Sequence, residues 1–188
     1  MSACGHGVWP PSANSRMLEL IKAFVAIALR RQGPEDLPAS RFLLGVTLAF
    51  YLVVQIPVAL IVFGATGTAL RTVFADIALL AVCLWILLFL TSKATRYLQT
   101  LSALLGTSAL LSALAIPFNL WRGAVDDPAA APALPTAVIL MLLIWSLVID
   151  GHIVGRALSR PFMLGLAIAI GYFFLHTTLL FEFMPAPE

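Results

Sequence analysis

Long apolar runs separated by short polar breaks make up most of this chain. Five runs are long enough to cross a bilayer core of about 30 Å, which takes about 20 residues of α-helix. They cover residues 42–63, 72–90, 98–120, 134–154 and 162–181. None alternates polar and apolar positions as the strands of a membrane β-barrel do, and a helix bonds its backbone groups within its own segment. The pattern predicts an all-α, polytopic membrane helix bundle with five transmembrane helices in residues 42–188.

A shorter amphipathic stretch precedes the first span. From Met17 to Arg31 the apolar residues recur at the i, i+3, i+4 spacing of one helix face, over a length of about 15 residues that is too short to cross a bilayer. We interpret residues 17–41 as an interfacial amphipathic helix and a linker, with basic residues facing anionic lipid head groups. A helix packed on the bundle is the alternative. The segment Gly33–Pro38 breaks this helix, and Ser40 suits the N-cap of the first span.

Residues 1–16 differ from the rest of the chain, because they contain no apolar run. A secretory signal peptide needs a charged segment followed by an apolar one, so these residues do not fit that class. They are predicted to form a disordered leader. Translation from Met1 and translation from Met17 both remain open at this point.

Composition places the chain among membrane proteins. Apolar residues make up 61% of the chain and charged residues 11%, compared with roughly 45–50% and about 25% in soluble domains. The formal net charge of +2 is too small to indicate nucleic-acid binding. Cys4 lies in the leader and Cys83 in the second span, so no disulfide is predicted.

The distribution of basic residues predicts the orientation of the chain. With the N-terminus in the cytoplasm, nine of the eleven lysines and arginines fall on the cytoplasmic side, as the positive-inside rule requires. These nine are Arg16, Lys22, Arg30, Arg31, Arg41, Lys93, Arg96, Arg156 and Arg160. Arg71 and Arg122 fall on the other side. The prediction is a multi-pass protein of a bacterial inner membrane, with a periplasmic C-terminus.

Asp76 and His176 form the first candidate site. An ionisable side chain inside a membrane is costly and is a functional hypothesis by default. Asp76 lies about four residues from the outer end of the second predicted span, and His176 lies in the outer half of the fifth. Both are predicted roughly 6–9 Å from the membrane centre. We expect the two side chains to face each other. Such a pair could respond to protons or bind a small ligand, or it could be a purely structural hydrogen bond.

Asp150, His152 and Arg156 form the second candidate, a polar cluster at the cytoplasmic end of the fourth span. Helical geometry separates Asp150 from His152 by about 200°, so one helix cannot join them. His152 shares a face with Arg156 and Trp145, whereas Asp150 shares a face with Ser146. The three are therefore predicted as interfacial anchors that need different neighbours. Gly151 and Gly155 form a small-xxx-small pair that permits close helix approach.

The layout resembles the bacterial members of the Yip family of five-span membrane proteins, over about residues 17–181. The resemblance rests on the basic amphipathic stretch with Gly33–Pro38, on the spacing of the spans, and on the segment Trp145–Ile153 followed by Ala157-Leu158, Phe162 and Gly165. Eukaryotic members are associated with small GTPases and vesicle traffic and carry an Asp-Leu-Tyr-Gly-Pro motif, which is absent here. The resemblance therefore implies the five-span fold and does not imply a GTPase partner.

Two function classes follow from these features. The sequence favours a non-enzymatic scaffold or accessory subunit that packs against membrane lipids and against another membrane protein or itself, because the chain has few polar groups inside the membrane. The other is a small-solute or ion permease, which predicts a cavity joining Asp76 and His176 to one side of the membrane. No catalytic, cofactor-binding or metal-binding motif is present in the sequence, so we expect no enzyme activity and no cofactor.

Overall fold

The computed structural model describes residues 22–124 and 132–183, and in this part of the chain five long helices dominate. The helices are α2 (Arg41–Phe63), α3 (Thr66–Leu90), α4 (Tyr97–Gly123), α5 (Ala133–Leu158) and α6 (Phe162–Phe183). Two short 3₁₀ turns are also present: η1 (Pro34–Asp36) precedes α2, and η2 (Ala94–Arg96) lies between α3 and α4. All five are long and apolar enough to span a membrane. The all-α, five-span prediction is confirmed, and the chain is a multi-pass membrane protein.

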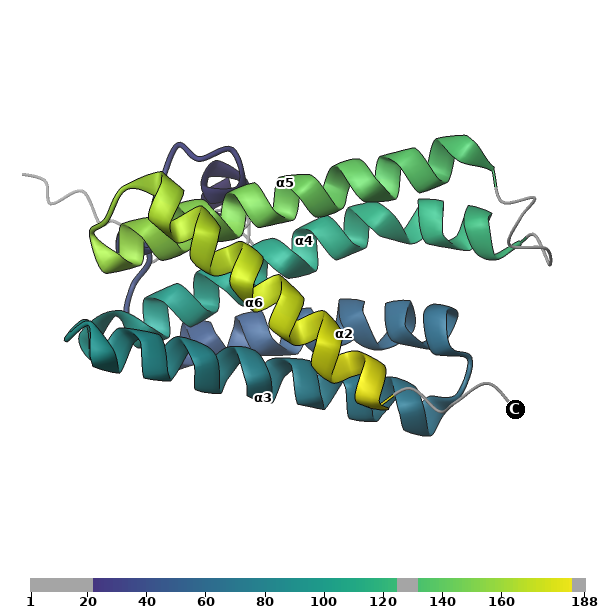
Figure 1. Ribbon diagram of the computed structural model, residues 1–188, viewed down its shortest axis with the longest axis horizontal. Coiled ribbons are helices and arrows are strands. Elements are labelled where there is room, and N and C mark those ends of the chain that lie inside the picture. Colours follow the sequence, from purple (N-terminus) through teal and green to yellow (C-terminus); the bar gives the residue numbers. More distant parts are fainter. Residues whose placement is uncertain (1–21, 125–131, 184–188) are drawn as a thin grey trace, which may run out of the picture.

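Helix α4 lies at the centre of the bundle. It packs extensively against α2 on one side and α5 on the other, whereas α3 contacts α4 and α6 only sparsely. Figure 1 shows α6 crossing obliquely from the end of α5 toward α3. The part of α4 from Thr100 to Thr107 is fully buried. Some hydroxyl groups in this part tolerate burial because they form hydrogen bonds within the helix. Thr107 Oγ1, for example, donates to the Ala103 carbonyl oxygen at 2.8 Å.

Glycines hold α5 and α6 together at close range. A Cβ atom on Gly165 would overlap the carbonyl oxygen of Gly151 and lie 2.8 Å from the Cα atom of Gly155. A Cβ atom on Gly151 would lie 2.7 Å from the Cα atom of Leu166. The backbones of the two helices therefore touch where they cross. This contact fixes α6 to α5 near the α5–α6 turn, and beyond it α6 diverges toward α3 (Figure 1).

Two helix boundaries differ markedly from those predicted. Helix α3 begins at Thr66 and not at Thr72, and α5 continues past Val154 to Leu158, which places Arg156 on the helix and not in a turn. Apolarity marks the part of a helix that suits lipid, while the helix itself continues until a cap ends it. Here the backbone of Ser159 adopts a left-handed conformation with φ of 54° and ends α5. Ser40 caps α2 as predicted, accepting from Phe42 N at 3.2 Å.

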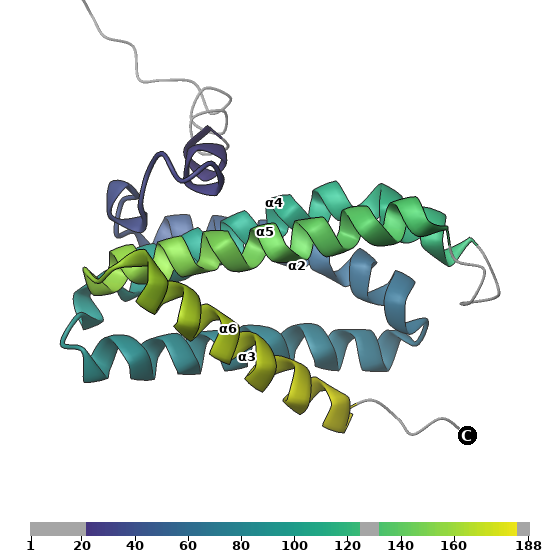
Figure 2. The same cartoon turned by 45° about the horizontal axis from the view of Figure 1, so that its top comes forward.

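The segment before η1 packs on the bundle. Residues 22–28 are helical, and the side chains of Phe24 and Ile27 are buried. The Phe24 ring occupies the space above Gly106 of α4, and the indole nitrogen of Trp145 donates to the Ala28 carbonyl oxygen at 3.3 Å. Figure 2 shows this segment on the outside of α4 and α5. Residues 22–28 therefore pack on the bundle, and the interfacial position of this helix stays a prediction. The predicted leader, residues 1–16, lies outside the described residues.

Candidate functional site

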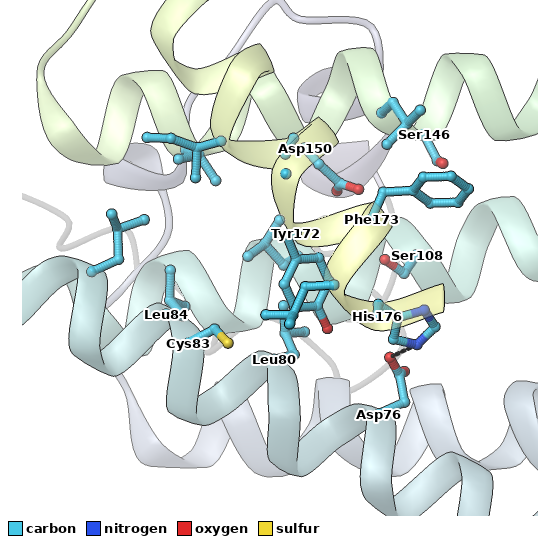
Figure 3. Close-up of a pocket in the computed structure, with 18 of the residues that line it drawn as sticks. Asp76, Leu80, Cys83, Leu84, Ser108, Ser146, Asp150, Tyr172, Phe173 and His176 are labelled. Carbon is cyan, nitrogen blue, oxygen red and sulfur yellow. Dashed lines mark ion pairs between the residues drawn. The ribbon is translucent and has the colours of Figure 1, made fainter. Parts of the chain in front are cut away.

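Asp76, Asp150 and His176 come from three different spanning helices and line one cavity. The cavity has a volume of about 430 Å³ and lies among α3, α4, α5 and α6, with one contribution from α2 (Figure 3). It exists because α6 packs tightly on α5 at the glycine contact and then diverges, while α3 contacts both α4 and α6 only sparsely. The walls are mainly apolar, with leucines such as Leu80, Leu84 and Leu87.

The structure brings Asp76 and His176 together. The Nε2 atom of His176 lies 2.7 Å from the Oδ1 atom of Asp76, and the two side chains are 23% and 20% exposed. The ring N–H does not point straight at the oxygen, so this contact is an ion pair without a well-aligned hydrogen bond. Asp76 lies ten residues inside α3, because α3 begins at Thr66. The predicted depth of four residues from the helix end was wrong.

Sequence reasoning missed a third member of this group, Tyr51 of α2. Its hydroxyl donates a hydrogen bond to the Oδ2 atom of Asp76, and its side chain is only 3% exposed. Each carboxylate oxygen of Asp76 therefore has its own partner. A tyrosine at the middle of an apolar helix is the signal in the sequence, because a buried tyrosine hydroxyl usually finds a hydrogen-bond partner.

Asp150 lies elsewhere on the same cavity and is not paired. Among the described residues, none gives its carboxylate a hydrogen bond or an ion pair. Ser146, one turn earlier on α5, lines the cavity beside it. The hydroxyl of Tyr172 is also buried without a hydrogen-bond partner in the described part of the chain. Figure 3 shows the Tyr172 ring between Asp150 and Asp76. The cavity therefore contains polar groups that the described protein does not satisfy.

The predicted cluster of Asp150, His152 and Arg156 is not one cluster. His152 Nε2 lies 3.2 Å from the Gln32 carbonyl oxygen, and Arg156 forms an ion pair with Glu35. Both therefore face the N-terminal segment, on the side of α5 away from the cavity. The separation follows from the 100° advance per residue, which puts Asp150 on a different face. The predicted set of polar anchors at this end is therefore reduced to His152 and Arg156, and Asp150 belongs to the cavity.

The volume and the lining of the cavity resemble those of small-molecule sites. Within the described ranges, no group of three or more histidine, cysteine, aspartate or glutamate side chains is placed to hold a metal. Cavities of about 300–1,000 Å³ with apolar walls and a few polar groups are typical of small-molecule sites. The thiol of Cys83 also lines this cavity, which provides a chemical probe of its contents.

Known proteins were compared with the chain by family model, by curated sequence and by solved structure, and none matched.

Proposed function

We propose that this protein binds a small solute within the membrane, at the cavity lined by Asp76, Asp150 and His176, and acts as a permease for it. One observation carries the proposal: three ionisable side chains from three spanning helices converge on one cavity of about 430 Å³. Ionisable residues inside a membrane are expensive, and they commonly mark substrate or ion pathways. The permease class predicts a cavity that joins Asp76 and His176 to one side of the membrane, and both residues line this cavity.

The unpaired groups distinguish this proposal from a purely structural one. A structural polar network in lipid satisfies its own members, as Tyr51 and Asp76 do through their hydrogen bond. Asp150 and the Tyr172 hydroxyl have no such partner among the described residues. A solute in the cavity supplies the missing partners, because a buried unsatisfied polar group costs about 1–3 kcal/mol.

The packing of α3 supports movement around the cavity. Helix α6 is held to α5 by backbone contact at Gly165, whereas α3 contacts α6 only sparsely. The Asp76–His176 ion pair joins α3 and α6 across this loose contact. We therefore assign the pair the role of a latch: when it breaks, α3 and α6 separate and the cavity opens.

Cys83 tests whether the cavity admits water-borne molecules. In a Cys4→Ser background, a small cationic methanethiosulfonate reagent should modify Cys83 in the folded protein. The matched control moves the thiol by one residue, in a Cys4→Ser, Cys83→Ser, Val82→Cys variant. Val82 is 54% exposed on the outer surface of α3, where lipid or detergent covers it. The control should react only after denaturation, and an equally unreactive Cys83 would rule out an accessible cavity.

A second candidate is the scaffold or accessory subunit, which packs against another membrane protein or a second copy of itself. Gly45 and Ala49 are both exposed on α2, one turn apart, and a Cβ atom added at Gly45 meets no other atom within 4 Å. Exposed small residues at this spacing let a second helix approach closely. Under this candidate, Gly45→Leu should abolish cross-linking to the partner and leave Cys83 reactivity unchanged.

Orientation, location and family are part of the same proposal. We place the protein in a bacterial inner membrane, in contact with its lipids, with a cytoplasmic N-terminus and a periplasmic C-terminus. Support comes from the basic end of the bundle, where Lys93 and Arg96 follow α3 while Arg156 and Arg160 flank the end of α5. The five-span arrangement supports the Yip-family resemblance, and the proposed activity is not enzymatic.

A further inference from the structure

We propose that the solute is an organic cation with an apolar body, and that the carboxylate of Asp150 recognises its charge. This inference rests on the proposed function, because it names the class of solute for the same cavity. Three observations carry it: the net charge of the cavity lining, the existing partners of each carboxylate, and the apolar character of the walls.

The charge balance of the cavity is negative. Its lining includes two carboxylates, Asp76 and Asp150, and one imidazole, His176, but neither lysine nor arginine. Even a protonated His176 offsets only one of two ionised carboxylates. An anionic solute would meet uncompensated repulsion in a site with apolar walls, where charges are weakly screened. A cationic solute supplies the missing positive charge.

Asp150, and not Asp76, is the carboxylate free to bind this charge. Both oxygens of Asp76 are already engaged, one by the Tyr51 hydroxyl and the other by His176. The carboxylate of Asp150 has no such engagement among the described residues. A desolvated carboxylate is costly unless it is paired or protonated. A bound cation would therefore gain more at Asp150 than at Asp76.

The walls indicate that the rest of the solute is apolar. Leucines cover much of the surface, and the aromatic rings of Tyr172 and Phe173 lie beside the polar groups (Figure 3). An aromatic ring face attracts a cation, and the attraction increases when water is excluded. A bare metal ion fits poorly, because it requires several oxygen ligands around one point. Figure 3 instead shows Asp150 and Asp76 on either side of the Tyr172 ring.

The test is equilibrium binding of tetraphenylphosphonium to the purified full-length chain, with tetraphenylborate as a probe of similar size and opposite charge. The wild-type protein should bind the phosphonium, and Asp150→Asn should weaken this binding by at least about tenfold, as loss of a desolvated charge pair does. Asp150→Glu should retain most of the affinity. The matched control, Asp36→Asn, removes one negative charge outside the cavity and should leave binding unchanged.

Folding is not expected to obscure this comparison. Asp150→Asn removes a carboxylate that bonds to none of the described residues, so the variant should be at least as stable as the wild type. Equal binding by wild type and Asp150→Asn would overturn the inference. Tighter binding of the borate than of the phosphonium would also overturn the inference, provided that the borate occupies the cavity. Loss of borate binding in Ser146→Trp, which keeps Asp150 but fills the cavity, would show that it does. In that case Cys83 protection by the borate would still support a solute site, so the proposed function would survive.

Failure of the proposed function gives a different result. Neither probe would bind above the level of protein-free micelles, and Cys83 would remain unmodified by the water-soluble reagent. Binding of the phosphonium with unchanged affinity in the Ser146→Trp variant would place its site outside the cavity and would count against both proposals. Selective loss in Asp150→Asn together with accessible Cys83 is the pattern that the inference predicts.

Discussion

The Nε2 atom of His176 in α6 lies 2.7 Å from the Oδ1 atom of Asp76 in α3, and this ion pair joins two helices that otherwise make few contacts. The Tyr51 hydroxyl of α2 holds the second oxygen of the same carboxylate. One acidic side chain therefore links three helices around the cavity. Its neighbour across the cavity, Asp150, has no comparable role in holding the helices together.

A double-mutant cycle tests this linkage. Asp76→Ala and His176→Ala should each lower the stability of the purified protein by about 1–3 kcal/mol, because each leaves a buried polar partner unsatisfied. The double variant should cost less than the sum, with a coupling of about 0.5–3 kcal/mol. Thermal unfolding in detergent measures all four proteins. Asp76→Ala combined with His152→Ala is the control, and it should be additive because His152 faces the N-terminal segment.

The glycine contact between α5 and α6 gives a second prediction. Gly165→Ala should destabilise the protein by about 1–3 kcal/mol, since a Cβ atom there overlaps the backbone of α5 and two rigid helices must separate. Gly45→Ala is the matched control, because its Cβ atom meets nothing within 4 Å. It should be neutral or stabilising by up to about 1 kcal/mol. Thermal unfolding of both variants measures the difference, and equal effects would mean that α5 and α6 do not touch through Gly165.

The N-terminal segment should detach when its buried aromatic anchor is removed. Phe24→Ala deletes a ring that is 5% exposed and packs on Gly106. The loss of a buried phenylalanine in a well-packed core costs about 3–5 kcal/mol, which is enough to release a short segment without unfolding the bundle. Amide hydrogen exchange should therefore rise selectively in residues 22–37. Val25→Ala, at a position 43% exposed, should leave exchange unchanged. Uniform exchange across the whole bundle would contradict a separately attached segment.

Topology reporters test the proposed orientation. A C-terminal fusion to an enzyme that is active only in the periplasm should be active, whereas the same enzyme fused after Ser92 should be inactive. Ser92 follows α3 at the basic end of the bundle. Stable protein with the opposite pair of activities would invert the orientation, and activity at both positions would contradict the count of spans.

The sequence predicted the five spans well because lipid imposes a length and an apolarity that can be read from one segment at a time. It located the α3 start poorly, because Thr66, Gly67 and Thr68 resemble a turn in composition although they form the first turn of the helix. Helix order was not readable, since all five spans are similarly apolar and the central place of α4 depends on packing among them.

The candidate site likewise combines features that single segments reveal with features that depend on packing between helices. Asp76 and His176 could be paired in advance because both were assigned to the outer halves of spans that run in opposite directions, although the depth of Asp76 was misjudged. Tyr51 could not be added, since that required knowing that α2 adjoins α3 at this level. Asp150 was grouped with His152 and Arg156 by depth alone. Helical geometry already separated Asp150 from His152, but which face met the cavity was set by the position of α6.

A permease must open its solute site to each side of the membrane, and the cavity that contains Cys83 is the proposed site. The most direct measurement is modification of Cys83 by a membrane-impermeant thiol reagent, applied to one side at a time of sealed vesicles with known protein orientation, in the Cys4→Ser background. We expect modification from both sides, and faster modification when Asp76→Ala or His176→Ala removes the latch between α3 and α6. Modification from neither side, in protein whose Cys83 reacts after denaturation, would contradict it.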